Sequence, residues 1–199
     1  ISSEKEMLDN ILRTLDSIEF ISSADLPNID LYMDQVTTFM DENLKSAKRY
    51  EDDKILTKTM INNYTKNHLL PSPLNKKYSK EHMLILLFIY YFKGFLSLSD
   101  IQSLMKPLTE HFFHSKDGIT IEQIYNDARL IGAQEAEHIR SDVLRTYDSV
   151  CSFYAGREQS ESGDGNHDPF LQIFTMITML SFDVYVKKQI IEKLIDSIT

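Results

Sequence analysis

The stretch LTKTMINNYTKNHLLPSPLNKKYSK, residues 56–80, decides the fold. Thr57 is a good helix N-cap, because its hydroxyl can accept a hydrogen bond from an unpaired amide of the first helical turn. We therefore expect a helix over 57–67. Pro71 and Pro73 cannot continue a helix, since proline lacks the amide hydrogen that the next turn requires. The stretch is thus a short helix followed by an enforced turn.

The two faces of this short helix differ in chemistry. Its apolar face consists of residues at helical spacing, namely Leu56, Met60, Ile61 and Tyr64. Its other face carries lysines, a threonine and amides, namely Lys58, Thr59, Asn62, Asn63 and Lys66. A short basic turn follows before the next helix, formed by Asn75, Lys76, Lys77 and Tyr78. A helix with outward amides and lysines beside a basic wing is suited to a nucleic-acid groove.

Charge is distributed unevenly along the chain. The 199 residues carry a net charge of −9 and are 42% hydrophobic, which suits one domain or two small ones with a buried core. Residues 45–80 hold nine lysines or arginines against three acids, so this part is +6 and the remainder is −15. Because residues 45–80 are basic and the rest of the chain is acidic, any anion-binding surface is expected within 45–80. Affinity for nucleic acid over the whole surface is not expected.

The cysteine content predicts a reducing compartment. Cys151 is the single cysteine, so it cannot form an internal disulfide. No apolar signal segment stands at the start of the sequence, and we expect a cytoplasmic protein. Cys151 falls on the apolar side of a predicted helix, where a small core residue is expected rather than a nucleophile.

Helices are predicted before the deciding stretch. An amphipathic packing helix is expected from Ser3 to Phe20. Asn28 or Asp30 can cap a second helix that reaches about residue 44 and supports the short helix of the deciding stretch. The polar, mixed-charge segment 45–54 is interpreted as a connector.

A buried helix is predicted directly after the deciding stretch. Ser79 begins it, and residues 82–92 (HMLILLFIYYF) are an almost unbroken apolar run. This run is shorter than the roughly 20 residues that a membrane span needs, so we expect burial in the protein. A further helix, capped near 97–100, is expected to stop at Pro107. Residues 108–118 are then a short helix or a loop.

The C-terminal part is predicted to be a pair of long helices. From 120 to 154, apolar residues alternate spacings of three and four, which is coiled-coil periodicity, and Gly132 is the place for a bend. Residues 156–166 are polar and rich in glycine and are predicted to be a mobile loop. Asp168 and Pro169 then supply the cap and the first-turn proline of a last helix. We expect no strand beyond the wing.

The last helix is strongly apolar in its first half, residues 170–186. This half is short for the hydrocarbon core and contains Asp183, so no membrane association is expected. Burial against the long helix, or against the same helix of a second subunit, is favoured. A monomer would have difficulty covering both apolar stripes, so we predict a homodimer through the C-terminal helices. The phenylalanine, methionine and tyrosine side chains of the C-terminal half of the chain also suit an unidentified small-molecule effector.

Two pairs of residues have a spacing found in metal sites. Glu135 and His138 share one helical face, as in di-iron bundles, but such a site needs the motif twice. His111 and His114 are also three apart, without a cysteine or a clear carboxylate set beside them. We therefore expect no metal and no other cofactor. Phosphate loops, serine elbows and zinc motifs are absent from the sequence, so we do not expect an enzyme.

The deciding stretch resembles a known superfamily of DNA-binding proteins. Residues 57–64, a threonine, two residues and MINNY, are followed by LLP at 69–71. This run is similar to the second helix and wing of the MerR superfamily of winged helix-turn-helix proteins. The pattern there is Ser or Thr, two residues, Thr-Leu-Arg-Tyr-Tyr, and then Gly-Leu-Leu-Pro. Lys76 and Tyr78 match the basic residue and closing tyrosine of the wing, and GFLSLSDIQSLM at 94–105 is similar to the superfamily's Gly-Phe-Ser-Leu helix.

A second resemblance covers about residues 27–108. LTKTMINNY with PSPLNKKY looks like the uncharacterised bacterial family called domain of unknown function 1836. The resemblances imply a winged helix-turn-helix fold, and this family has no established activity. Asn62 stands where the MerR superfamily has arginine and Asn63 where it has its first tyrosine, while Tyr64 keeps the second. The connector 45–54 is an addition to that pattern, and the wing is shorter.

We predict an all-α protein made of a winged helix-turn-helix module and a C-terminal hairpin of long helices. Its expected parts are a packing helix in 1–26, the module in 27–108, and a dimerisation or effector domain in 109–199. The leading hypothesis for its function is a dimeric transcriptional regulator that binds double-stranded DNA at specific sequences.

The expected DNA-binding residues all belong to the short helix and the wing, and they are Lys58, Thr59, Asn62, Asn63, Tyr64, Lys66, Lys76 and Lys77. The asparagine amides can read an adenine edge and the lysines can hold phosphates. The spacing of Tyr64 fits a core residue as well as a phosphate ligand. The rival hypothesis is a protein-interaction adaptor that keeps the fold without DNA. Acidic side chains of 51–53 folded over the lysines would favour the adaptor.

Overall fold

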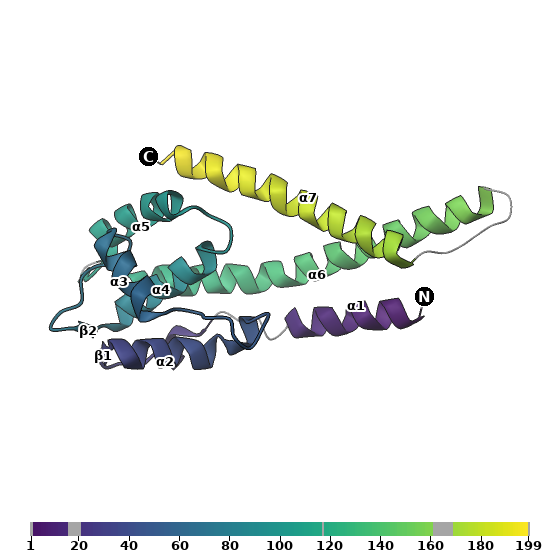
Figure 1. The fold of residues 1–199 in the computed structure, drawn as a ribbon. Coiled ribbons are helices and arrows are strands. Elements are labelled where there is room, and N and C mark those ends of the chain that lie inside the picture. Colours follow the sequence, from purple (N-terminus) through teal and green to yellow (C-terminus); the bar gives the residue numbers. More distant parts are fainter. Residues whose placement is uncertain (1, 16–20, 117, 161–168, 199) are drawn as a thin grey trace. The chain divides into compact units, whose positions relative to one another are not determined.

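The computed structural model describes residues 2–15, 21–116, 118–160 and 169–198. Within these ranges the chain forms seven α-helices and one two-stranded sheet, so the protein is all-α as predicted (Figure 1). The chain divides into two units, Ile1–Ile131 with Ile198–Thr199, and Gly132–Ser197. The predicted boundaries at residues 26 and 108 stay predictions.

The N-terminal helix α1 spans Ser2–Leu15. Residues 16–20, which were expected to continue it, lie outside the described residues. Leu12 is buried, whereas Met7 and Ile11 are about half exposed, so one narrow stripe of the helix is covered. A short 3-10 helix, η1 (Ser23–Asp25), follows.

The chain forms a short strand directly after Asn28 and Asp30, where the sequence predicted the start of a helix. Strand β1 (Leu31–Tyr32) pairs antiparallel with β2 (Lys77–Tyr78), with Leu31 opposite Tyr78 and Tyr32 opposite Lys77. The expectation of no strand beyond the wing was therefore wrong. The partner of β1 lies more than forty residues away along the chain, so no local pattern could show the pairing.

Helix α2 (Met33–Asn43) begins after this strand, and the predicted caps Asn28 and Asp30 were wrong. Tyr32 is the N-cap residue, and its backbone N–H donates to Gln35 Oε1 at 2.8 Å. Val36 and Met40 are fully buried, so α2 supports the next helix as expected. The 3-10 helix η2 (Lys45–Ala47) opens the connector.

Helix α3 (Lys58–Lys66) is the short helix of the deciding stretch. The predicted cap is confirmed, because Met60 N–H donates to the Thr57 hydroxyl at 3.2 Å. Ile61 is fully buried and Tyr64 is buried, so the predicted apolar face is the packed one.

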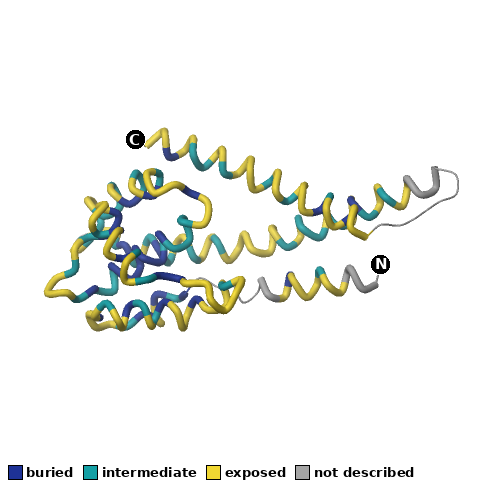
Figure 2. The backbone as a smooth tube through the Cα atoms, in the orientation of Figure 1, coloured by how far each residue is buried: buried dark blue, intermediate teal, exposed yellow. Residues whose placement is uncertain are grey.

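Helix α4 (Lys80–Phe92) is the core of the first unit. Seven of its residues are buried, including the whole run from His82 to Leu87, which confirms the predicted burial. Figure 2 shows this helix as the darkest part of the tube. The half-buried Lys93 after α4 donates to the backbone oxygen of Ile55, which fastens the connector to the core.

Helix α5 (Leu98–Phe112) runs through Pro107, so the predicted stop there was wrong. Ser97 caps it, with Asp100 N–H donating to the Ser97 hydroxyl at 3.1 Å. Proline removes one helical hydrogen bond but has the φ of a helix. Buried Ile101 and Met105 hold α5 against the core, and this packing outweighs the missing bond.

Helix α6 (Ile121–Ser160) begins in the first unit. Tyr125 is 1% exposed and its hydroxyl donates to the Ile21 backbone oxygen at 2.8 Å. Residues 156–160 are helical, so the mobile loop predicted over 156–166 was wrong for that part. The remaining part, and Asp168, lie outside the described residues. The prediction rested on three glycines among polar residues in 156–166, a composition that is typical of a loop but does not exclude a helix.

The second unit contains the rest of α6 and helix α7 (Pro169–Asp196). Pro169 is the first helical residue, as predicted. The Tyr154 and Thr175 hydroxyls are 2.8 Å apart, and Val150 and Met176 are buried. Most of α7 is nevertheless exposed (Figure 2). By length and composition α7 is a candidate membrane span, with 11% of its apolar window buried.

Candidate nucleic-acid interface

The outward face of α3 carries the predicted groove-reading residues. It is exposed at every expected position, namely Lys58, Thr59, Asn62, Asn63 and Lys66. The side chains of Asn62 and Asn63 have no hydrogen-bond partner among the described residues, so both amides are free to bind a ligand. The opposite face is held by buried Ile61, which fixes the orientation of the amides.

Tyr64 lies in the core of the module and is 7% exposed. Burial raises the pKa of its phenol above the usual value of 10.0. Its role as a packing residue is therefore visible in the structure, whereas a contact of its hydroxyl with phosphate stays a prediction.

The end of α3 is locked by a left-handed residue. His68 has a φ of 58°, and its N–H donates to Thr65 O at 3.2 Å. Leu69 N–H donates to Tyr64 O at 2.9 Å. This pair of bonds is the Schellman motif, which most often has glycine at the left-handed position. Gln102 of α5 also donates to the Asn67 backbone oxygen at 3.0 Å, so the helix end is tied to the core.

The wing is a tight hairpin turn. Asn75 and Lys76 both have positive φ, 51° and 62°, and Lys77 N–H donates to Leu74 O at 2.9 Å. Two consecutive positive φ values characterise a type I′ turn, whose twist matches the flanking strands. Lys76 is exposed at the tip. The Lys77 ammonium lies 5.2 Å from the centre of the Tyr32 ring, which holds that side chain beside β1.

One lysine of the predicted set has an acidic partner that the sequence did not reveal. Lys58 forms an ion pair with Asp34 of α2, and both side chains are largely exposed. Lys66 and Lys76 form no ion pair with any described residue. Asp34 and Lys58 are 24 positions apart, so the pair follows from the packing of α2 against α3 rather than from any local pattern.

The acids of 51–53 do not cover the lysines of α3 or the wing. The Asp53 carboxylate accepts from the backbone N–H groups of Arg49 and Tyr50 at 3.1 and 3.0 Å, so it closes its own loop. Glu51 and Asp52 are exposed and form no ion pair with a described lysine.

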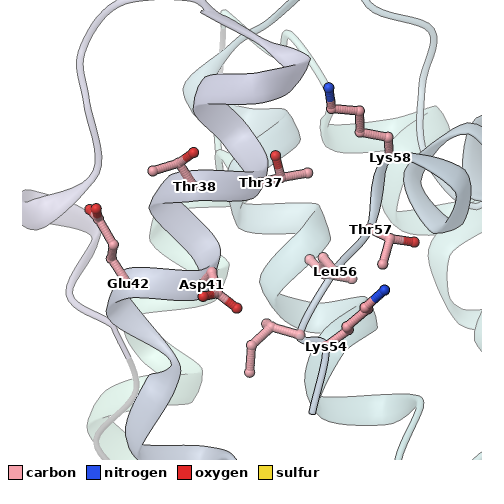
Figure 3. A pocket seen from close by; sticks show the side chains of 9 residues that line it. Thr37, Thr38, Asp41, Glu42, Lys54, Leu56, Thr57 and Lys58 are labelled. Atoms are coloured by element: carbon pink, nitrogen blue, oxygen red, sulfur yellow. The ribbon is translucent and has the colours of Figure 1, made fainter. Parts of the chain in front are cut away.

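A groove lies beside the start of α3, between α2 and the chain at 54–58 (Figure 3). Its volume is about 460 Å³. Both elements contribute side chains to its lining, which consists of Thr37, Thr38, Asp41, Glu42, Lys54, Ile55, Leu56, Thr57 and Lys58. This groove was not predicted from the sequence. The inserted connector 45–54 was the available signal, because it separates two helices that the MerR pattern keeps close.

Below the wing, His82 is a buried support. Its ring lies edge-on to Tyr78 and Phe113, with centroid distances of 5.5 and 4.9 Å. Ser79 N–H donates to His82 Nδ1 at 3.0 Å, which completes the cap of α4. Burial lowers the pKa of His82 from 6.5 to about 4, so the ring is neutral at physiological pH.

The two pairs that have the spacing of metal sites do not join a larger cluster of ligand side chains among the described residues. His138 Nδ1 lies 3.6 Å from a Glu135 carboxylate oxygen on the surface of α6. His114 pairs with Glu81 at 2.7 Å, and His111 Nδ1 lies 2.8 Å from Pro107 O. In the described part of the chain, no three histidine, cysteine or carboxylate side chains are grouped so that they could hold a metal ion.

Comparison with known families gives one match, which covers the chain from before β1 to the first turns of α6. The family described as a domain of unknown function (DUF1836) matches residues 21–128, more than half of the chain. The chain belongs to this family. The DUF1836 match begins earlier and ends later than the predicted 27–108, and it takes in Ile21 and Tyr125, which the hydrogen bond at the start of α6 joins. No curated protein and no solved structure matches the chain.

Proposed function

We propose that the protein is a sequence-specific DNA-binding transcriptional regulator with a MerR-like winged helix-turn-helix module. The observation that supports this most is the outward face of α3, with two unpartnered amides and Lys66, beside a wing that presents Lys76. Strand, helix, helix and basic hairpin follow one another in the order that such a module requires.

The end of α3 gives independent support for the MerR likeness. His68 stands at the position where the MerR pattern has the glycine of Gly-Leu-Leu-Pro. Its φ of 58° is the conformation for which glycine is favoured. The backbone of this chain therefore adopts the shape that the superfamily's glycine requires, although the residue differs.

In this proposal α3 enters the major groove of double-stranded DNA. Asn62 and Asn63 offer bidentate amides to adenine edges, whereas Lys66 and Lys76 bind phosphates and set the register. Lys58 and Thr59 lie at the helix start, where phosphates also bind. Lys58 contributes less than the other lysines, because Asp34 already neutralises part of its charge.

The regulator acts as a homodimer in the cytoplasm. Two recognition helices in successive major grooves need a separation of roughly 34 Å, which two-fold symmetry supplies. The exposed apolar side chains of α7, including Phe174 and Phe182, are the surface for this association.

The test is fluorescence anisotropy of the full chain with labelled genomic fragments at several salt concentrations. A protein that neutralises several phosphates loses affinity steeply as the salt concentration rises. Lys66→Ala should reduce the slope of the logarithm of the binding constant against the logarithm of the salt concentration by about one. Asn62→Ala should weaken the preferred fragment by about tenfold and leave binding to unrelated fragments unchanged. Lys116→Ala, an exposed lysine remote in sequence from α3 and the wing, is the control.

The rival function is a protein-interaction adaptor that uses the same surface. The Asp34–Lys58 pair favours it, because a carboxylate at the start of the recognition helix opposes phosphate. Absence of any DNA binding at low salt by the folded chain would reject the regulator and leave the adaptor.

A further inference from the structure

The outward face of the two-stranded sheet carries a row of side chains that the core does not use. Leu31 lies opposite Tyr78 and both are buried, so this pair faces the core. Tyr32 lies opposite Lys77, and Lys77 also forms a bridge with Leu74 on the other arm of the hairpin. Directly opposite residues point to the same face of a sheet, whereas successive residues alternate. The outward row therefore consists of Tyr32, Lys77 and Leu74.

Leu74 is the most exposed member of this row. It is 76% exposed, more than any other large apolar residue that the structure describes. Tyr32 is 53% exposed, and its ring lies under the Lys77 ammonium at 5.2 Å from the ring centre. Transfer of an apolar side chain from water to an apolar surface is favourable. A partner that covers Leu74 is therefore bound more tightly than one that leaves it in water.

The arm of the hairpin that ends in Leu74 is stiff. Pro71 and Pro73 fix two of its φ angles. Lys77 N–H donates to Leu74 O at 2.9 Å and closes the turn directly behind this residue. A stiff hairpin loses little conformational entropy when one of its side chains is inserted into a partner. Leu74 is thus presented in advance rather than ordered by binding.

The charge beside the turn indicates an anionic partner. Lys76 at the tip and Lys77 in the outward row form no ion pair with any described residue. Asp30 precedes β1, and the antiparallel register places it toward the end of the sheet that joins α4, away from the turn. Asp34 follows β1 and already pairs with Lys58. A polyanion that also offers an apolar surface matches this end of the sheet.

The outward row lies next to the start of the recognition helix. Tyr32 is the N-cap residue of α2, and Asp34 in the first turn of α2 pairs with Lys58 at the start of α3. Tyr32 and Lys58 are therefore joined by a single helical turn and one ion pair. When α3 occupies the major groove, an element beside it meets the bordering phosphates and then the adjacent minor groove.

We propose that Leu74 inserts into the minor groove of the DNA held by α3 and acts there as an apolar wedge between two base pairs. The inference rests on the proposed DNA-binding function and adds to it a bend in the bound DNA. Lys76 and Lys77 bind phosphates that border the groove, while Leu74 contacts the faces of the bases. A wedge of this kind partly unstacks one base step and kinks the duplex by roughly 20–90°.

The first experiment measures the shape of the bound DNA. Resonance energy transfer between dyes at the two ends of the preferred fragment reports their separation. The full chain should increase the transfer, because a kink brings the ends together. Leu74→Ala should lose most of this increase and weaken binding of the fragment by about tenfold, since the apolar contact is removed. Leu74→Met keeps an apolar side chain of similar volume and should retain the bend.

Two controls separate the wedge from effects on folding. Leu130→Ala truncates an exposed leucine of α6, and this variant should bend the DNA as the wild-type chain does. Leu74→Ala removes no buried contact, so its urea unfolding midpoint by circular dichroism should equal that of the wild-type chain.

The second experiment locates the wedge on the DNA. 2-Aminopurine, an adenine analogue whose fluorescence rises when it is unstacked, replaces adenines at successive positions of the fragment. The wild-type chain should raise the fluorescence at one base step outside the bases that α3 contacts. Leu74→Ala should remove this rise, whereas Leu74→Met should keep it.

The outcomes distinguish this inference from the proposed function. A wild-type chain that binds DNA without bending it, or a Leu74→Ala variant that bends and unstacks the DNA equally, rejects the wedge and leaves the DNA function standing. Failure of the folded chain to bind any DNA rejects the proposed function and the wedge together, and leaves the outward row to a protein partner.

Discussion

At the scale of single residues, the buried histidine under the wing links fold stability to pH. His82 is 3% exposed and its Nδ1 accepts from Ser79 N–H, so the ring is built into the structure in its neutral form. In the unfolded chain the pKa is 6.5, and in the folded chain burial lowers it to about 4. Protons are therefore bound preferentially by the unfolded chain between these values.

This difference predicts a loss of stability in acid. The contribution is complete above about pH 6.5 and is lost progressively as the pH falls to 4, by about 3 kcal/mol in all at 1.36 kcal/mol per pKa unit. Urea unfolding followed by circular dichroism across this range measures it. His82→Gln keeps an acceptor for the helix cap but does not titrate, so its unfolding free energy should depend less on pH. An equal dependence in the variant would contradict the assignment to His82.

At the scale of elements, Lys76 in the wing turn both adopts the left-handed backbone conformation that the turn requires and presents a charge for binding. Lys76 has a φ of 62°, which strains an L-residue, although its exposed ammonium suits phosphate. Asn-Gly is the preferred pair for a type I′ turn, and this chain has Asn75 followed by lysine. The position therefore has a conformational cost that the charge of Lys76 would justify.

Lys76→Gly should separate these two roles. Relief of the left-handed strain should raise the unfolding free energy by about 0.5–1 kcal/mol, after the greater freedom of glycine in the unfolded chain is counted. The same change should weaken DNA binding and reduce the salt slope by about one. Lys76→Ala is the matched control, because it removes the charge but keeps the strain. If both variants unfold at the same urea concentration, the turn is not strained at this residue.

Elements that depend on local chemistry were predictable from the sequence. Thr57 caps α3 because a hydroxyl and a free amide are three residues apart, and the burial of α4 follows from its unbroken apolar run. The course of α5 through Pro107 was not predictable, because burial of its neighbours decides it. Strand β1 depends on a partner that only the folded chain supplies.

The candidate site shows the same division. The exposure of Asn62, Asn63 and Lys66 followed from helical spacing around buried Ile61. The Asp34–Lys58 pair and the groove beside α3 did not, because both depend on how α2 packs against residues that follow the connector. The spacing of residues along one segment cannot predict contacts between segments that are distant in the sequence.

At the scale of the whole molecule, the exposed apolar surface of α7 requires a partner that covers it. Its exposed apolar side chains in the first half lie outside the stripe of buried Gln172 and Met176, and they include Phe170, Phe174, Ile177, Phe182 and Tyr185. An exposed apolar surface of this extent is normally enclosed by protein or lipid. A second copy of the chain is the occupant that also serves the proposed function, since a helix-turn-helix regulator needs two recognition helices.

The dimer predicts a defined response to charge on α7. Sedimentation equilibrium of the full chain at micromolar concentration should give twice the chain mass. Phe174 and Phe182 are 56% and 63% exposed, and burial of each in an interface would contribute about 2–3 kcal/mol. Phe174→Glu with Phe182→Glu should therefore weaken association by about a hundredfold or more and yield a monomer, whereas Gln189→Glu, an exposed polar position of the same helix, should remain dimeric.

Vesicle flotation is run beside these measurements. A wild-type chain that sediments as a monomer and floats with lipid vesicles would show that α7 is covered by membrane, which would overturn both the dimer and the expectation that the protein does not associate with membranes.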